Sequence, residues 1–199
     1  MGYFPFFVDI TGKKGLVVGG GRIALRKIQT LLPFAPQLSV VASEILPEIE
    51  DLKTAAEAAG TKIVCMHRCY EEADLADAFF VIAATADGAL NAAISAQCRT
   101  RGILVNAVDD REHCSFLFPS LTRKGPLTVA VSTEGASPMV SAILRRQFEA
   151  QIPDQIEAIL EELEQERELV RMQIPDDAKR AAYLKERAIR ALTSQEEKE

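Results

Sequence analysis

The sequence lacks the features that mark several other classes of protein. No apolar run approaches the length of about 20 residues that spans a bilayer, and the start, MGYFPFFVDI, has no basic segment typical of a secretory signal. Internal repeats and low-complexity linkers are absent too. The four cysteines form no CxxC pair, and a cytoplasm would keep them reduced. We therefore expect a cytoplasmic protein with no membrane partner and no disulfides.

An excess of positive charge is also absent. The net charge is −6 over 199 residues, and residues 153–199 contribute −5 of this net charge. This negative net charge argues against non-specific binding of nucleic acid. Residues 1–152 are nearly neutral overall, so a local basic pocket there could hold an anionic small molecule. With 48% hydrophobic and 26% charged residues, the composition is that of a globular protein with one sizeable core and a smaller module.

Short β-rich runs alternate with helical stretches through the first half of the chain. Capped segments that end at glycine predict helices over residues 43–60 and 87–102. The alternation indicates an α/β fold with a Rossmann-type parallel sheet and right-handed crossovers. The predicted strands are residues 15–19, 37–42, 62–67, 79–84 and 103–108.

The second half has a different pattern. Residues 116–133 predict two strands joined by a turn, and helices follow from Ser137, a good N-cap, with Pro138 in the first helical position. The predicted domains are a Rossmann domain over residues 1–113, a small β-containing central module over 114–150 and a helical C-terminal region over 151–199.

A glycine-rich loop follows the first predicted strand. In KKGLVVGGGRIALRK, the spacing Gly19-x-Gly21-x-x-Ala24 matches the dinucleotide-binding fingerprint. The strand before the loop and the amphipathic helix after it would place free N–H groups where a pyrophosphate binds. An ordinary glycine turn is the alternative. The candidate cofactor-binding residues of this loop are Gly19, Gly20, Gly21, Arg22 and Ile23.

Five sequence blocks occur in order: YFPFFVDITGKKGLVVGGGRIALRK, FFVIAATADGALN, GILVNAVDD, FLFPSLTRKGPLTVAVSTEGASP and LRR. Together they resemble the precorrin-2 dehydrogenase family, the N-terminal module of siroheme synthases, which includes bifunctional dehydrogenase/ferrochelatases. The resemblance extends over residues 3–148. It implies a Rossmann domain, a central module that forms a homodimer, a helical C-terminal part, and oxidation of precorrin-2 to sirohydrochlorin with NAD.

The segment ILVNAVDD would bring polar side chains to the carboxyl end of a strand, where ligands lie in doubly wound sheets. The resemblance implies that Asp109 is the general base of the reaction, and that in bifunctional members it also serves metal insertion. Asn106 is a candidate substrate contact. An aspartate pair can instead cap a turn, and for Asp110 we keep that interpretation.

Further cofactor contacts are expected after the second and fourth strands. Thr85 would border the nicotinamide, and Ser43 and Glu44 would meet the adenosine ribose. An acid is usual directly after the strand, but Ser43 stands there, and Glu44 could instead lie in the first turn of a helix. We predict NAD, with NADP open because Arg22 could contact a 2′-phosphate.

The loop STEGASP is the candidate cradle for carboxylates of the substrate. It combines hydroxyl groups, a glycine and the start of a helix. The alternative is a loop that merely supplies an N-cap. The candidate substrate-binding residues in the loop are Ser132, Thr133, Gly135 and Ser137.

Two groups of soft ligands raise the question of a metal. Cys65, His67 and Cys69 alternate along one strand, and His113 and Cys114 follow the aspartate pair. Neither group has the spacing of a structural zinc site, and a strand cysteine is commonly a small buried apolar residue. No permanent metal site is predicted, although transient handling of iron by Asp109 and His113 stays open.

The leading hypothesis is an NAD-dependent precorrin-2 dehydrogenase, with ferrochelatase activity left open. The alternative is a nucleotide-sensing Rossmann module without catalysis. Such a sensor needs the glycine loop but no base. The blocks NAVDD and STEGASP therefore favour the enzyme.

Overall fold

The structure is a computed structural model that describes residues 2–58, 60–108 and 110–193. It forms two compact units, Met1–Phe118 and Pro119–Glu199. No helix among the described residues has the length and apolar character needed to cross a membrane.

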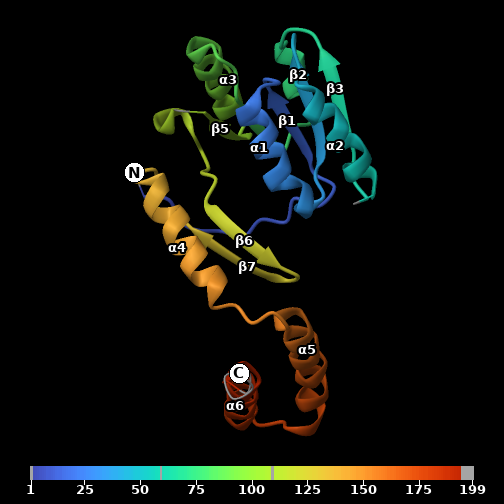
Figure 1. Ribbon diagram of the computed structural model, residues 1–199, viewed down its shortest axis with the longest axis vertical. Coiled ribbons are helices and arrows are strands. Elements are labelled where there is room, and N and C mark those ends of the chain that lie inside the picture. Colours follow the sequence, from blue (N-terminus) through green and yellow to red (C-terminus); the bar gives the residue numbers. More distant parts are fainter. Residues whose placement is uncertain (1, 59, 109, 194–199) are drawn as a thin grey trace. The chain divides into compact units, whose positions relative to one another are not determined.

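The first unit is a parallel α/β sheet, which confirms the predicted fold class. Its strands pair in the order β3-β2-β1-β4-β5 and all run parallel, with helices between them (Figure 1). The strand order reverses between β1 and β4, and such a reversal marks the ligand crevice in doubly wound sheets. The elements are β1 (Lys14–Val18), α1 (Arg22–Leu31), η1 (Leu32–Phe34), β2 (Gln37–Ala42), α2 (Pro47–Ala58), β3 (Ile63–His67), η2 (Glu72–Leu75), β4 (Phe80–Ala83), α3 (Gly88–Thr100), β5 (Leu104–Ala107) and η3 (Arg111–His113).

Two apolar layers hold this sheet between its helices. Successive side chains of a strand point to opposite faces, so Leu16 and Val18 of β1 join one cluster and Val17 joins the other. Helix α3 covers the first face, with Ile94 fully buried. Helices α1 and α2 cover the second face, with Ile28 fully buried. The central strands β1 and β4 have only apolar residues at their buried positions, as expected for a parallel sheet covered on both sides.

Up to residue 193, the second unit combines a hairpin with three helices. Strands β6 (Ser120–Lys124) and β7 (Leu127–Val131) are antiparallel, and Gly125 takes a φ of +53° in the turn between them. Helix α4 (Pro138–Ala150) packs on both strands. Helices α5 (Ile156–Gln173) and α6 (Asp177–Thr193) pack together and are joined through ion pairs of Arg187. The predicted domain boundaries stay predictions.

Candidate functional site

The three glycines after β1 have different environments. Gly19 takes a φ of +121°, and a Cβ added there would lie 2.3 Å from the carbonyl oxygen of Ala84. A Cβ on Gly20 would lie 2.2 Å from the carbonyl oxygen of Glu44. A Cβ on Gly21 would have no heavy atom within 4 Å. The first two glycines are therefore required by the packing of the protein itself, whereas Gly21 leaves open space above the loop.

Helix α1 begins directly at that open space. Gly21 is its N-cap and contributes no side-chain hydrogen bond, and no acidic residue lies in the first turn. Arg22 and Ile23 are exposed, while Ala24 is fully buried where the helix meets the sheet. The N–H groups of the first turn can therefore bind an anion. This arrangement fits the pyrophosphate of a dinucleotide.

The segment after β2 packs on the glycine loop. Leu46 N–H donates to the Gly20 carbonyl oxygen at 2.9 Å, and Ser43 and Glu44 are both exposed. Helix α2 begins at Pro47, so Glu44 precedes the helix and does not lie in its first turn. The helix predicted from residue 43 was wrong at its start because the contact with Gly20 holds this segment as a loop.

The segment after β4 lies on the other side of the loop. A Cβ on Gly19 would lie 3.2 Å from the Thr85 nitrogen, so the structure brings the predicted cofactor segments after β1, β2 and β4 together. The Thr85 hydroxyl lies 2.8 Å from Asn91 Oδ1 and 3.0 Å from the Asp87 carbonyl oxygen. The sequence analysis did not identify Asn91 as a residue of this site. A polar residue on the buried face of a predicted helix was the signal that could have indicated it.

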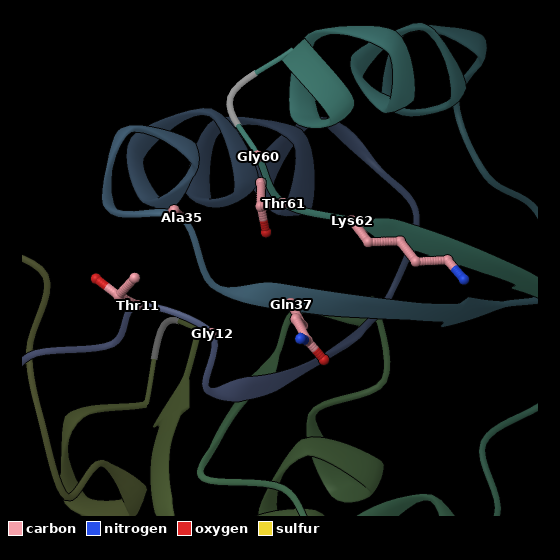
Figure 2. Close-up of a pocket in the computed structure, with 7 residues that line it drawn as sticks. All are labelled: Thr11, Gly12, Ala35, Gln37, Gly60, Thr61 and Lys62. Carbon is pink, nitrogen blue, oxygen red and sulfur yellow. The ribbon is translucent and has the colours of Figure 1, made fainter.

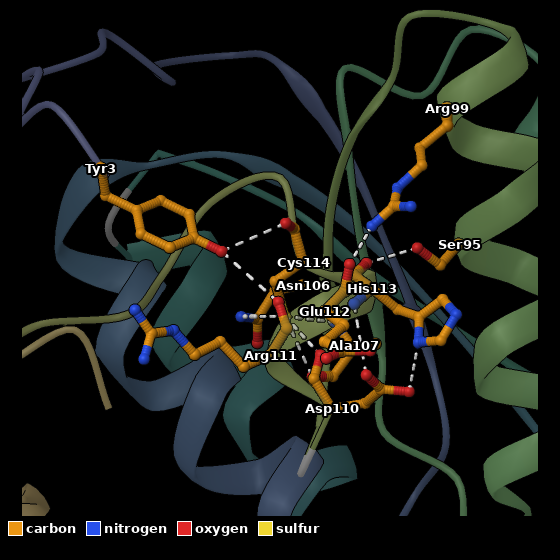
Figure 3. Close-up of polar contacts among 10 residues, drawn as sticks. All are labelled: Tyr3, Ser95, Arg99, Asn106, Ala107, Asp110, Arg111, Glu112, His113 and Cys114. Carbon is orange, nitrogen blue, oxygen red and sulfur yellow. Dashed lines mark hydrogen bonds and ion pairs between the residues drawn. The ribbon is translucent and has the colours of Figure 1, made fainter. Parts of the chain in front are cut away.

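Beyond β5, one of the two aspartates has a clear structural role (Figure 3). Asp110 is the N-cap of η3 and accepts a hydrogen bond from His113 N–H at 3.2 Å. Its Oδ2 lies 2.5 Å from His113 Nδ1, and this hydrogen bond lowers the pKa of Asp110. The interpretation of Asp110 as a turn cap is confirmed. Asp109, the predicted base, lies outside the described residues.

The end of β5 is held by the side chains of Asn106 and Cys114, in a bonding role that the sequence did not predict. The Asn106 amide donates to the Phe116 carbonyl oxygen at 3.0 Å, and its oxygen accepts from Lys27 Nζ at 3.2 Å. The Cys114 thiol accepts from Ala107 N–H at 3.2 Å and donates to the Ala107 carbonyl oxygen at 3.1 Å. Burial raises the pKa of the Cys114 thiol. Cys114 is thus a structural thiol, and the substrate role of Asn106 stays a prediction.

In the second unit, the hydroxyls of the candidate cradle bond within the loop. Thr133 Oγ1 accepts from Ser137 N–H at 3.1 Å and donates to the Ser137 carbonyl oxygen at 3.0 Å. Ser137 Oγ accepts from Val140 N–H at 3.3 Å as the N-cap of α4. Ser132 Oγ accepts from a backbone N–H two residues on, and Gly135 has a φ of +83°. The predicted capping role of Ser137 is confirmed, while binding of substrate by the loop stays a prediction.

The cysteine and histidine residues considered as metal ligands do not form a metal site in the described part of the chain. Among residues 2–58, 60–108 and 110–193, no three His, Cys, Asp or Glu side chains form a group that could hold an ion. His67 Nε2 instead lies 2.9 Å from Glu50 Oε1 on α2, while Cys69 is exposed. Burial raises the pKa of Cys65.

A cavity of about 280 Å³ lies at the amino ends of the strands, opposite the end that carries the glycine loop (Figure 2). Gln37, the first residue of β2, and Lys62, directly before β3, line it. In open parallel sheets, ligands bind beyond the carboxyl ends of the strands, and this cavity lies at the amino ends. None of the predicted site residues lines it.

Comparison with known proteins gives consistent matches over both units. Residues 6–120 match the family described as "Putative NAD(P)-binding", and residues 124–151 match "Sirohaem biosynthesis protein central". The siroheme synthase of Sodalis glossinidius is 40% identical over 153 residues, 77% of this chain and 31% of that protein. That of Actinobacillus pleuropneumoniae serotype 3 is 34% identical over 183 residues, 92% of this chain and 37% of that protein. The chain spans about a third of the length of these relatives.

The likeness to a solved structure extends over nearly the whole chain. The protein titled "SirC, precorrin-2 dehydrogenase" has a TM-score of 0.77 and 25% sequence identity, and the likeness covers 96% of this chain and 93% of that one. The predicted Rossmann-type sheet with a small second sheet and terminal helices is confirmed. The match over residues 6–120 also confirms the prediction that the glycine loop belongs to an NAD(P)-binding domain.

Proposed function

Because this chain belongs to the family described as "Putative NAD(P)-binding", we propose that it is an NAD-dependent dehydrogenase that oxidises precorrin-2 to sirohydrochlorin in siroheme biosynthesis. The likeness to a precorrin-2 dehydrogenase over 96% of the chain carries the proposal, because it extends through both units. A nucleotide sensor would need only the first unit. The central segment described for sirohaem biosynthesis supports the enzyme as well.

When bound, NAD supplies the acceptor for the hydride. The N–H groups at the start of α1 would hold its pyrophosphate, and the open space at Gly21 would admit it. Glu44, exposed before α2, would accept hydrogen bonds from the adenosine ribose and repel a 2′-phosphate. Arg22 would favour that phosphate, so titration with NAD and with NADP tests the preference. Tighter binding of NADP would overturn it.

Oxidation of the tetrapyrrole also releases a proton, and we assign its acceptance to Asp109. The assignment comes from the resemblance to precorrin-2 dehydrogenases. Its neighbour is less suited, because the hydrogen bond from His113 lowers the pKa of Asp110 and makes that carboxylate a weaker base. The transfer of hydride to the cofactor and of the proton to Asp109 balances the two-electron oxidation.

Substrate carboxylates are assigned to the loop before α4. The hydroxyls of Ser132, Thr133 and Ser137 stabilise this loop from within. Binding would therefore fall to backbone N–H groups that these hydroxyls do not engage, such as those of Gly135 and Met139, near the start of α4 where the helix dipole favours an anion.

We also propose a cytoplasmic homodimer formed through the second unit. Helix α4 exposes an apolar stripe in which Phe148 is 46% and Ile143 is 49% accessible. The stripe follows the helical repeat of an amphipathic helix, and a contiguous apolar patch of this kind marks an interaction surface. A two-fold axis would let the same stripe face itself in two copies.

An anaerobic assay that follows the absorption of sirohydrochlorin tests the proposed reaction. Asp109→Asn should lower turnover by about a hundredfold or more, because it removes the proton acceptor and keeps the size of the side chain. Asp110→Asn should change turnover much less, since asparagine also caps helices well. Calorimetric titration should give both variants the wild-type affinity for NAD.

A wild-type rate for Asp109→Asn in single turnover would refute the assignment of the base. Binding of NAD by the wild type without any change in the precorrin-2 spectrum would favour the nucleotide sensor instead. Adding Fe²⁺ after the oxidation has finished shows in the same cuvette whether the chain also inserts metal.

A further inference from the structure

We infer that Asn91 is a positioning residue for the dinucleotide site, acting through the turn that follows β4. This inference rests on the proposed function. It deepens that proposal by naming a side chain that determines how firmly the cofactor binds, although the side chain itself is buried away from the cofactor.

One carboxamide satisfies three groups of one residue. Asn91, in the first turns of α3, is only 4% exposed. Its Oδ1 accepts from Thr85 N–H at 3.2 Å and from the Thr85 hydroxyl at 2.8 Å. Its Nδ2 donates to the Thr85 carbonyl oxygen at 3.1 Å. An asparagine offers both donor and acceptor in this geometry, and a hydrophobic residue in its place would remove this partner from the Thr85 N–H and from the Thr85 carbonyl oxygen.

Further hydrogen bonds stabilise the same turn, which runs from Thr85 to the start of α3. The Thr85 hydroxyl accepts from Asp87 N–H at 3.2 Å, and Asp87 Oδ1 caps α3 by accepting from Ala89 N–H at 2.9 Å. Asn91 N–H donates to the Asp87 carbonyl oxygen at 3.0 Å. The N–H, hydroxyl and carbonyl groups of Thr85 are therefore all hydrogen-bonded within the protein. Thr85 would contact a bound cofactor through its shape and not through a hydrogen bond.

The turn that Asn91 stabilises is in contact with the glycine loop. Ala84 N–H donates to the Val18 carbonyl oxygen at 2.8 Å, and a Cβ on Gly19 would lie 2.3 Å from the Ala84 carbonyl oxygen. Gly19 thus touches the backbone that Asn91 holds. The contact lies between β1 and β4, where the strand order reverses and a dinucleotide crosses the sheet. Loosening the turn would loosen the loop that receives the pyrophosphate.

Calorimetric titration with NAD tests the inference without the tetrapyrrole. Asn91→Ala should raise the Kd for NAD about tenfold, the effect of losing hydrogen bonds that hold a binding loop in shape. Asn91→Asp keeps the acceptor for the Thr85 N–H, but it replaces the donor to the Thr85 carbonyl oxygen with a second acceptor. It should therefore also raise the Kd for NAD, and it is the second variant to measure if the alanine variant does not fold.

Cys98→Ala is the matched control. Cys98 lies on the same helix, is fully buried and packs in the same apolar cluster as Ile94, so its truncation lowers stability without touching the turn. Its Kd for NAD should stay within about twofold of the wild-type value. An unchanged Kd in Asn91→Ala, or an equal loss in Cys98→Ala, would overturn the inference. Failure of the wild type to bind NAD would instead overturn the proposed function, and the inference with it.

Discussion

Gly21→Asp should abolish binding of NAD while leaving the fold intact. Gly21 is the N-cap of α1 with φ −89° and ψ −171°, an extended conformation that any residue adopts. A Cβ there would meet no heavy atom within 4 Å. Aspartate is moreover a favoured N-cap, and its charge suits the helix dipole, so the free protein should be as stable as the wild type or more stable by about 0.5 kcal/mol.

The cost to the cofactor is electrostatic. The new carboxylate would stand in the open space assigned to the pyrophosphate, and it would itself accept the hydrogen bonds of the first helical turn. At a separation of about 5 Å and an effective dielectric constant of about 20, each pair of unit charges repels by about 3 kcal/mol. That energy alone weakens binding by about 150-fold.

Calorimetry with NAD measures this loss, and a thermal melt shows that the variant is folded. Gln155→Asp is a matched control, because Gln155 is the N-cap of α5 in the second unit and likewise makes no side-chain hydrogen bond as a cap. It should bind NAD within about threefold of the wild type, because its charge is added at another helix. A folded Gly21→Asp variant with the affinity of the wild type would refute the assignment of the cofactor to the glycine loop.

Three further predictions concern pH, thiols and assembly. The Arg68 guanidinium lowers the pKa of Asp74, so Asp74→Asn should be less stable by about 1 kcal/mol at pH 7. This difference is present above the unfolded pKa of about 4 and should vanish as pH falls through the lower folded pKa in urea titrations; a constant difference down to pH 2 would contradict the pairing. Exposed Cys69 should react with a thiol reagent at pH 8 in the native protein, whereas Cys98, whose pKa burial raises to about 11, should react only in denaturant; equal rates in native protein would be inconsistent with the fold. Light scattering should give twice the chain mass of 21.8 kDa for the wild type and the single mass for Phe148→Glu; a monomeric wild type at micromolar concentration would rule out the homodimer.

Much of the candidate site could be predicted because its signals are local. The run of apolar residues before Gly19, the glycine spacing and the amphipathic segment after it lie within 20 residues of each other, and they form β1, the loop and α1. Ser137 followed by a proline likewise predicted the start of α4 correctly. Capping and helical period depend on neighbours one or two turns away, so one sequence contains the necessary information.

Contacts between distant segments explain what the sequence could not supply. The helix predicted from residue 43 begins at Pro47, since Gly20 holds the preceding backbone. The thiol of Cys114 completes the hydrogen bonding of Ala107 at the end of β5, and nothing in the residue type announces this. Asn91 was visible only as a polar residue on a buried helical face, and its partner Thr85 could not be read from the pattern.

The sequence by itself determined the alternation of strands and helices, the position of the glycine loop and the helix caps, because each depends on side chains close together in the chain. Only the tertiary structure decided which candidate groups are already used. Asp110 is bonded to His113 and Thr85 to Asn91, while Gly21 alone among the three loop glycines faces open space. Those differences arise when parallel strands bring residues such as Gly19 and Ala84 into contact across more than 60 intervening positions, and a local pattern contains no record of such a contact.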